Sequence, residues 1–229
     1  MSSRPWFWLD SGSGSGAENM ALDEALMESA GGLPGPILRF YSWKEQAATF
    51  GYFQRHAEIV ALTHLRPLFR RPTGGGLVPH DHDWTYSLTF PPADPWYELR
   101  AEESYRVLHE WIRESFARLG VATALSPCCA KEKPGQCFAG PEKFDLLWEG
   151  HKVAGAAQRR SRQALLIQGS IQQQPPQVKR AEWQLSFLKA GEDLFGSPAS
   201  PYALTSPVQA TARRLVESKY SQRSYLEKR

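Results

Sequence analysis

The chain has few cysteines and no long apolar run, and each of these shortages excludes a class of protein. Its three cysteines make an odd count, and Cys128 and Cys129 are adjacent, so no disulfide framework is expected. No apolar run approaches the roughly 18 to 20 residues that span a bilayer, and the segment from Met1 to Trp8 lacks the apolar stretch of a secretory signal. We therefore expect a cytoplasmic protein with reduced thiols and no membrane segment.

The net charge is small, but it is unevenly distributed. A formal charge of +3 does not indicate a nucleic-acid partner. The segment from Thr211 to Arg229 is nevertheless basic, because it carries six Lys or Arg side chains against Glu217 and Glu227. This pattern is typical of a solvated helix face, and the alternative is a docking surface for an acidic protein partner.

Length and composition predict one folded domain over residues 1–229. A chain of 229 residues can bury one substantial core, and its 41% hydrophobic and 22% charged residues are ordinary for a globular protein. Strand and helix patterns interleave without strict βαβ alternation. We therefore expect an α+β fold with a mixed, largely antiparallel β-sheet flanked by helices.

Two helical patterns are the longest local signals. A helix is predicted from Ala17 to Ala30, with Asn19 as its cap and Gly31-Gly32 at its end. The second spans Ala101 to Leu119, and its stripe, which includes Tyr105, is assigned to the core. Strands are predicted over 6–9, 37–43, 48–53, 68–71, 85–90, 144–148, 151–157 and 164–171, with turns at 12–16 and Gly150 and a later helical stretch over 209–218.

Two arginines precede a run of three glycines in Arg70-Arg-Pro-Thr-Gly-Gly-Gly76. Backbone N–H groups in such a run can approach an anion or a thioester carbonyl closely. The run lacks the Lys-Ser/Thr ending of a phosphate-binding loop and the spacing of a dinucleotide fingerprint, so it does not predict a nucleotide site. A plain tight turn is the alternative interpretation.

The segment His80-Asp-His-Asp83 contains metal-ligand side chains without a complete ligand set. On an extended strand His80 and His82 would share a face, but no third and fourth ligand follow, and the cysteines show no Cys-x-x-Cys pattern. We expect no metal, and instead a His-Asp pair that orients a loop or a catalytic group.

Cys137 lies in a loop whose sequence, Gly135-Gln-Cys-Phe-Ala-Gly-Pro141, favours exposed and kinked backbone. A free thiol has a pKa near 8.5, so a nearby cation is needed to raise its thiolate fraction at neutral pH. Lys152, in the following predicted hairpin, is the candidate cation. An inert thiol and a solvated lysine are the alternatives, and Cys128 and Cys129 are assigned to the inert class.

These motifs, taken in order, resemble the lipoate–protein ligase and octanoyltransferase family, which shares its catalytic fold with biotin–protein ligases. The resemblance covers the chain up to Ile171, and the tail beyond it is poorly matched. It rests on the segments Leu9-Asp-Ser-Gly12, Asn19-Met-Ala-Leu-Asp-Glu-Ala25, Leu38-Arg-Phe-Tyr41, Gly51-Tyr-Phe-Gln54, Arg70 to Gly76, His80-Asp81, Cys137-Phe138 and Gly150 to Gln158.

Within that family, the sequence around Cys137, Phe144-Asp145 and Lys152 looks like the cysteine-dependent LipM-type octanoyltransferases. The resemblance implies that Cys137 is the nucleophile and that Lys152 hydrogen-bonds the acyl carbonyl. It implies substrate-binding roles for Arg71, Gly74, Gly75, Gly76, His80 and Gly155. It also implies that octanoate comes from acyl carrier protein and goes to a lysine of a lipoyl domain or of glycine-cleavage H protein, with no cofactor.

Three other functions stay open. Gly76 is commoner in ATP-dependent lipoate–protein ligases, which would make ATP a substrate. Gln158-Arg-Arg160 resembles the amidotransferases that move octanoyl between lipoyl domains through a cysteine. A homologue that only binds lipoyl domains or acyl ligands is the non-enzymatic alternative.

Overall fold

The computed structural model describes residues 3–129, 135, 138 and 140–228. Within them, one sheet has eight strands in the order β11-β1-β2-β6-β10-β9-β8-β7. Its strands are β1 (Phe7–Gly14), β2 (Ile37–Trp43), β6 (Trp84–Phe90), β7 (Ala124–Leu125), β8 (Leu146–Trp148), β9 (His151–Arg160), β10 (Leu165–Ile171) and β11 (Ser200–Pro201). A smaller sheet has the order β4-β3-β5 and consists of β3 (Ala47–Phe50), β4 (Leu68–Arg70) and β5 (Val78–His80).

The large sheet is mixed but mostly antiparallel. β1 runs parallel to β2 and to β11. Every other pair of neighbours, along the series β2-β6-β10-β9-β8-β7, is antiparallel. The predicted α+β class is therefore confirmed. The hairpin predicted at Gly150 is also present, and this glycine has a φ of +80°, a conformation that favours glycine.

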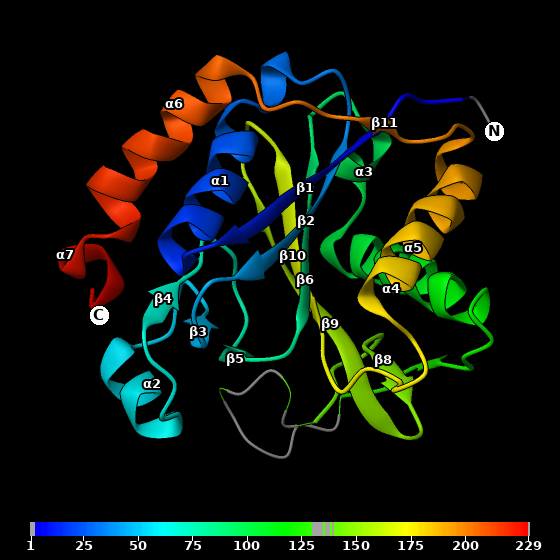
Figure 1. Cartoon of the computed structure of the whole chain (residues 1–229), viewed down its shortest axis with the longest axis horizontal. Coiled ribbons are helices and arrows are strands. Elements are labelled where there is room, and N and C mark those ends of the chain that lie inside the picture. The colour runs from blue at the N-terminus through cyan, green and yellow to red at the C-terminus, as the bar shows by residue number, and fades with distance from the viewer. Residues whose placement is uncertain (1–2, 130–134, 136–137, 139, 229) are drawn as a thin grey trace.

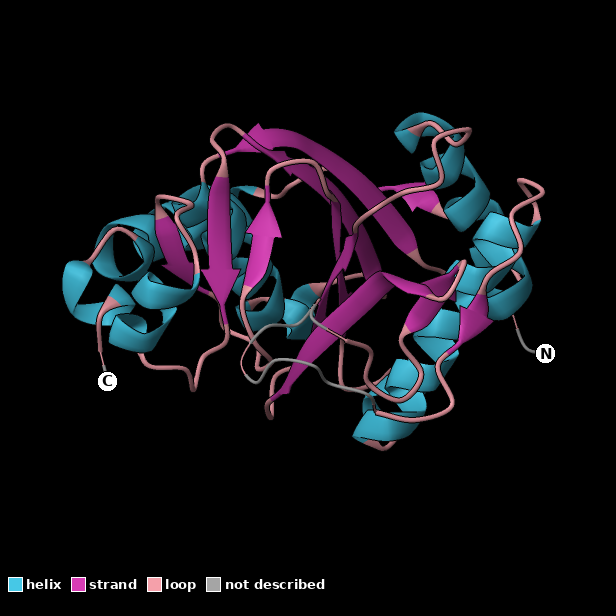
Figure 2. Cartoon of the chain, turned by 90° about the horizontal axis from the view of Figure 1, so that it is seen from below, coloured by secondary structure: helices cyan, strands magenta, loops and turns pink. Residues whose placement is uncertain are grey.

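Helices cover both faces of the large sheet (Figures 1 and 2). One face carries α1 (Gly16–Glu28) with α6 (Ser206–Leu215) packed beside it, and the other carries α4 (Ala101–Ala117) and α5 (Arg180–Phe195). The main core lies under α4 and α5, where Phe40 and Tyr86 of the sheet contact Trp183 and Phe187. The shorter helical elements are Ala30–Gly32, α2 (His56–Leu62), α3 (Pro95–Glu98), the π-helical Val216–Tyr220 and α7 (Arg223–Leu226).

The start of α1 differs from the prediction. β1 continues through the expected flexible turn to Gly14, and Ser15 rather than Asn19 caps the helix. The Ser15 hydroxyl accepts from the Glu18 amide at 3.3 Å, and the Glu18 carboxylate accepts from the Ser15 amide at 2.7 Å, which is a capping box. Asn19 instead donates its side-chain amide to the carbonyl of Ser42, and thereby ties α1 to β2.

The basic C-terminal segment packs onto α1 and pairs with acidic groups of the same chain. Val208, Leu215 and Tyr220 bury their side chains against the α1 region. Arg214 lies 2.6 Å from Glu28, and Lys219 lies 2.5 Å from the buried carboxylate of Glu24. Among the helices that the structure describes, none has both the length and the apolar character needed to cross a bilayer.

Candidate active site

Two rows of residues cross the large sheet in register on the face that carries α1. Residues two apart on a strand point to the same face, so the two rows lie side by side. The first row is Tyr41, Thr85, Ser170 and Gly155, and the second is Arg39, Ser87, Gln168 and Ala157. These rows form the floor of the site.

Above this floor lies a narrow pocket between α1, the large sheet and the small sheet. Met20 of α1, Val78 of β5 and Phe138 supply apolar walls, and Arg71, His80 and Lys152 supply polar ones. A mostly apolar pocket with a few convergent polar groups is the usual form of a small-ligand site. The pocket therefore suits a short apolar chain that carries one polar end.

Lys152 lies where this pocket meets a second, more open cleft. That open cleft is lined by residues that include Gln54, Gly75, Gly76, Gly135 and Phe144. The ammonium lies 2.6 Å from the Asp145 carboxylate, and both side chains are buried, which compensates part of the cost of burying each charge. It also lies 4.8 Å from the centre of the Phe138 ring. Gly155, on the same strand, leaves the space that the Lys152 side chain occupies.

Asp145 is held by groups that the sequence analysis did not assign to the site. The Tyr105 hydroxyl donates to one carboxylate oxygen, and the Glu142 amide donates to the other at 2.6 Å. Tyr105 was predicted to belong only to the core stripe of its helix, and that prediction is wrong because its hydroxyl extends past the core to Asp145. Burial, together with the Asp145 charge, raises the pKa of Tyr105 well above its usual value, so the phenol stays a donor.

Behind Tyr105, the same helix carries a buried histidine. His109 Nδ1 lies 2.9 Å from the Tyr105 carbonyl, and burial lowers the pKa of His109 to about 4 despite the nearby Asp145 charge. The imidazole is therefore neutral at pH 7, with its proton on Nδ1. His109 supports the position of Tyr105, whose ring centre lies 4.2 Å from that of the imidazole.

Arg71 shapes the glycine loop from inside the protein. Its guanidinium donates to the Gly74 carbonyl from Nε at 3.0 Å and from a terminal nitrogen at 2.5 Å, and it contacts the Thr49 hydroxyl at 3.4 Å. A Cβ on Gly51 would lie 1.9 Å from the Gly75 carbonyl oxygen, so these two backbone segments touch. The contacts with Arg71 and Gly51 thus hold the backbone of the glycine loop in one conformation.

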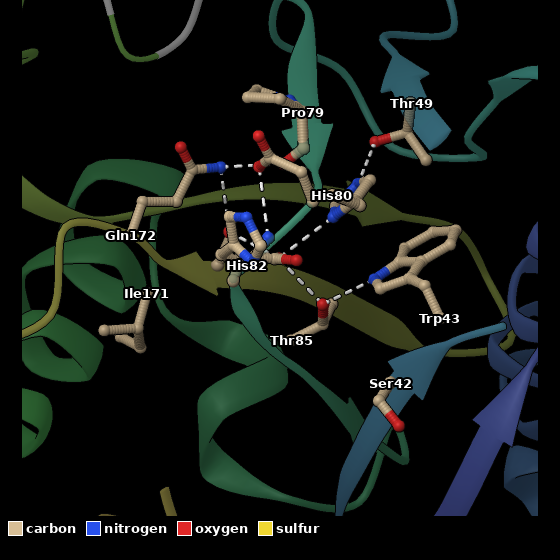
Figure 3. A network of polar contacts seen from close by, with 12 residues as sticks. Ser42, Trp43, Thr49, Pro79, His80, His82, Thr85, Ile171 and Gln172 are labelled. Atoms are coloured by element: carbon tan, nitrogen blue, oxygen red, sulfur yellow. Dashed lines mark hydrogen bonds and ion pairs between the residues drawn. The ribbon is translucent and has the colours of Figure 1, made fainter. Parts of the chain in front are cut away.

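His80 belongs to a network on the small-sheet side of the pocket (Figure 3). Its Nδ1 lies 2.9 Å from the Asp83 carboxylate and its Nε2 2.8 Å from the Thr49 hydroxyl, and the Trp43 ring stacks on it at 3.9 Å. Thr85 also donates to Asp83, at 2.8 Å. This is the predicted His-Asp pair, formed by His80 and Asp83.

The charge of Asp83 is stabilised although it is deeply buried. Burial alone would raise the pKa of Asp83, but the charge and hydrogen bond of His80 and the hydroxyls of Ser170 and Thr85 together lower it. The network therefore holds an ionised carboxylate against Thr85 and Ser170 of the first row, and the imidazole ring of His80 is fixed from both nitrogen atoms.

A second buried carboxylate, Asp23 of α1, faces the second row from the helix side. It accepts from Arg39 at 2.6 Å, from Ser87 at 2.6 Å and from the Gln168 amide at 2.7 Å. Gln168 in turn accepts from the hydroxyl of Thr73, next to the glycine loop, at 2.7 Å. This polar layer joins α1, the sheet and the loop at the α1 end of the pocket, and the sequence analysis did not identify it.

The structure brings most of the predicted site residues together. Arg71, His80, Lys152 and Gly155 line the pocket, and Gly75 and Gly76 line the adjoining open cleft. Gly74 lines a separate hollow and presents its carbonyl to Arg71. Cys137 lies outside the described residues, although its neighbours Gly135 and Phe138 line the cleft and the pocket respectively. Over the ranges that are described, no cluster of three His, Cys, Asp or Glu side chains suits a metal ion.

Comparison with known proteins adds the family context. A sequence model of the lipoyl protein ligase A/B catalytic domain matches residues 15–180. Octanoyltransferase LipM of Lysinibacillus sphaericus is 37% identical over 179 residues, which are 72% of this chain and 65% of that protein. The Bacillus subtilis protein of the same name is 37% identical over 185 residues, 75% of this chain and 66% of that one. The chain thus spans less than two thirds of the length of these relatives.

Two solved structures share the fold over nearly their whole length. A putative lipoate protein ligase from Thermoplasma acidophilum with bound lipoic acid superposes with a TM-score of 0.79 at 21% identity, over 98% of this chain and 99% of that one. Lipoate-protein ligase A bound with ATP gives a TM-score of 0.78 at 20% identity, with the same coverage. At this identity the likeness establishes a common fold.

Proposed function

Because the chain belongs to the lipoyl protein ligase A/B catalytic domain family, we propose that it is an octanoyltransferase of protein lipoylation. In this proposal octanoyl moves from acyl carrier protein to Cys137, and then to a lysine of a lipoyl domain. The observation that carries the proposal is the position of Lys152, a buried ammonium where an apolar pocket meets an open cleft. That border is where the carbonyl of a bound acyl chain would lie.

The first step forms the acyl-enzyme. The Cys137 thiolate attacks the thioester carbonyl of the donor, the bond to the carrier sulfur breaks, and the carrier leaves as a thiol after it takes a proton. The negative charge that develops on the carbonyl oxygen is stabilised by the Lys152 ammonium and by backbone amides of the glycine loop. The octanoyl chain lies in the pocket, between Met20 and Val78.

The second step releases the product. The acceptor lysine first loses a proton and then attacks the Cys137 thioester as a neutral amine. An amide bond forms, the bond to sulfur breaks, and Cys137 leaves as a thiolate. Lys152 stabilises the oxyanion again, so one cation serves both transfers.

An ATP-dependent lipoate–protein ligase is the second candidate, and one observation favours it. Gly75 and Gly76 line the open cleft beside Lys152, where an acyl-adenylate would have room for its phosphate near backbone amides. In that reaction Cys137 would have no chemical role. The two candidates therefore differ in whether acyl transfer needs ATP or a cysteine.

Intact mass spectrometry distinguishes them. Wild type and Cys137→Ser are incubated with octanoyl-acyl carrier protein without ATP. An octanoyl adduct on wild type alone, released by hydroxylamine, supports the transferase. If no adduct forms, and a lipoyl domain is modified only with lipoate and ATP, the ligase is the function and the transferase proposal is wrong.

A further inference from the structure

Gln54 connects two loops of the candidate site that lie far apart in the sequence. It follows β3, and its side-chain oxygen accepts from the Gly51 amide at 2.9 Å. Its side-chain nitrogen donates to the carbonyl of Gly135 at 3.0 Å, across 81 residues of sequence. Both the oxygen and the nitrogen of the Gln54 side-chain amide therefore form a hydrogen bond, the oxygen as acceptor and the nitrogen as donor.

The Gly135 carbonyl is also held from a second direction. The Leu77 amide, which follows the glycine loop, donates to it at 2.8 Å. Gly135 has a φ of +82°, so its backbone adopts a conformation that other residues rarely take. Gln54, Gly135 and Lys152 all line the same open cleft. Gly135 thus lines the same cleft as Lys152, the side chain that is proposed to stabilise the oxyanion.

Arg70 fixes the backbone of Gln54. One guanidinium nitrogen donates to the carbonyls of Tyr52 at 2.8 Å and Gln54 at 2.6 Å. Its other nitrogens donate to C-terminal carbonyls, those of Tyr225 and Leu226 at 3.2 Å and that of Lys228. Arg70 is completely buried, and its guanidinium holds the backbone of Tyr52 and Gln54 and the C-terminal residues together. The basic C-terminal segment thereby supports the loop that carries Gln54.

We propose that Gln54 is a positioning residue for the nucleophile, and that it acts by fixing Gly135, two residues before Cys137. This inference rests on the proposed function. Acyl transfer requires the attacking sulfur close to the carbonyl and in the right direction, and a displacement of about 1 Å can slow a reaction roughly 100-fold. Two hydrogen bonds hold the Gly135 carbonyl in place, and Gly135 is linked to Cys137 through one intervening residue.

The substitution Gln54→Glu tests this with little change in shape. The carboxylate keeps an acceptor for the Gly51 amide, but it loses the donor and places a charged oxygen against the Gly135 carbonyl. Gln209→Glu is the matched control, because Gln209 also donates to a backbone carbonyl, that of Leu204 at 3.0 Å, on the exposed surface of α6. Gln54→Met, which removes both hydrogen bonds without adding charge, is the second variant.

Two rates are measured, both with Cys128 and Cys129 replaced by serine. One is single-turnover acylation of Cys137 by octanoyl-acyl carrier protein, and the other is alkylation of Cys137 by iodoacetamide from pH 6 to 9. We expect Gln54→Glu and Gln54→Met to slow acylation by about 10- to 100-fold and to change the pH profile of alkylation. Gln209→Glu should match wild type in both rates.

The outcomes separate this inference from the proposed function. If wild type forms no acyl adduct, the transferase proposal fails, while the alkylation profile still tests the position of Cys137. Acylation and alkylation within twofold of wild type in both Gln54 variants would overturn the inference. Loss of cooperative thermal unfolding in both variants would overturn it as well, since Gln54 would then support the fold as a whole.

Discussion

Gly155 and Lys152 depend on each other because the lysine side chain occupies the space where a side chain on residue 155 would begin. A Cβ on Gly155 would lie 2.6 Å from Cε and 2.8 Å from Nζ of Lys152. It would also lie 3.3 Å from a carboxylate oxygen of Asp145. Glycine at this position therefore allows the ammonium to lie against the strand and still contact its carboxylate partner.

The substitution Gly155→Ala should displace the Lys152 ammonium and slow acyl transfer. A shift of about 1 Å in a catalytic group is expected to lower the rate roughly 100-fold, with a smaller effect on substrate binding. The measurement is kcat and KM for octanoyl transfer together with thermal unfolding. Gly31→Ala is the control, since a Cβ there meets no atom within 4 Å. Equal rates for the two variants would show that Lys152 does not need its present position.

Removing the partner carboxylate tests the ion pair itself. Asp145→Asn removes the buried carboxylate that pairs with the Lys152 ammonium, so we expect a loss of about 3 to 5 kcal/mol in the free energy of unfolding. Asp193→Asn is the control, because Asp193 pairs with Arg118 on the surface and should cost no more than about 1 kcal/mol. Urea unfolding at pH 7 measures both changes. A small effect at Asp145 would indicate that water or another group replaces the carboxylate.

The sequence was enough to predict those parts of the site that depend on local pattern. Strands β2 and β10 follow from runs of apolar and β-branched residues, and Lys152 follows from its place in a hairpin after Gly150. The polar layer around Asp23, at the α1 end of the pocket, could not be predicted in the same way. Gln168 contacts Asp23 across 145 residues, and nothing near either residue indicates the other. Such contacts depend on strand register, which sequence pattern alone does not determine.

The sequence analysis expected helical stretches between proline breaks beyond Pro175 but did not locate helix α5. Gly191 lies inside it and lowers its helical propensity, and Pro175 and Pro176 precede it in the sequence. The structure explains the glycine, because a Cβ there would lie 2.5 Å from the Trp6 ring and 2.7 Å from the Trp111 ring. The residue that weakens the local helical signal is the one that permits close packing on the core.

Acidification should destabilise the protein through His109. The pKa of His109 is lowered from 6.5 to about 4 by burial, so between these values the unfolded chain binds the proton more strongly than the folded one. The free energy of unfolding therefore does not depend on His109 above about pH 6.5. It decreases as the pH falls towards 4, with a slope of at most about 1.4 kcal/mol per pH unit. Urea midpoints at pH 7 and pH 5 measure the loss. His109→Phe should reduce the difference between them, whereas replacement of the exposed His64 by glutamine should leave it unchanged.

Met20 should limit the length of the acyl chain. Its side chain lines the pocket from α1 and contacts Gln168, whose amide lies 3.4 Å from the Met20 sulfur and belongs to the polar layer around Asp23. A longer chain would have to displace Met20 or enter that layer, and breaking buried hydrogen bonds costs about 1 to 3 kcal/mol for each group left unpaired. Met20→Ala enlarges the apolar space without removing the layer.

We expect Met20→Ala to raise the rate of decanoyl transfer relative to octanoyl transfer, since each additional buried methylene contributes about 0.8 kcal/mol, or roughly fourfold in affinity. The measurement is competition between the two acyl-carrier proteins, read by the mass of the modified lipoyl domain. Met27→Ala is the matched control, because Met27 is equally buried on the same helix but does not line the pocket. Both variants should lose stability, and Met20→Ala alone should change the acyl preference. A shift of the same size in both variants would mean that α1 loosens as a whole, and that Met20 does not set the depth of the pocket.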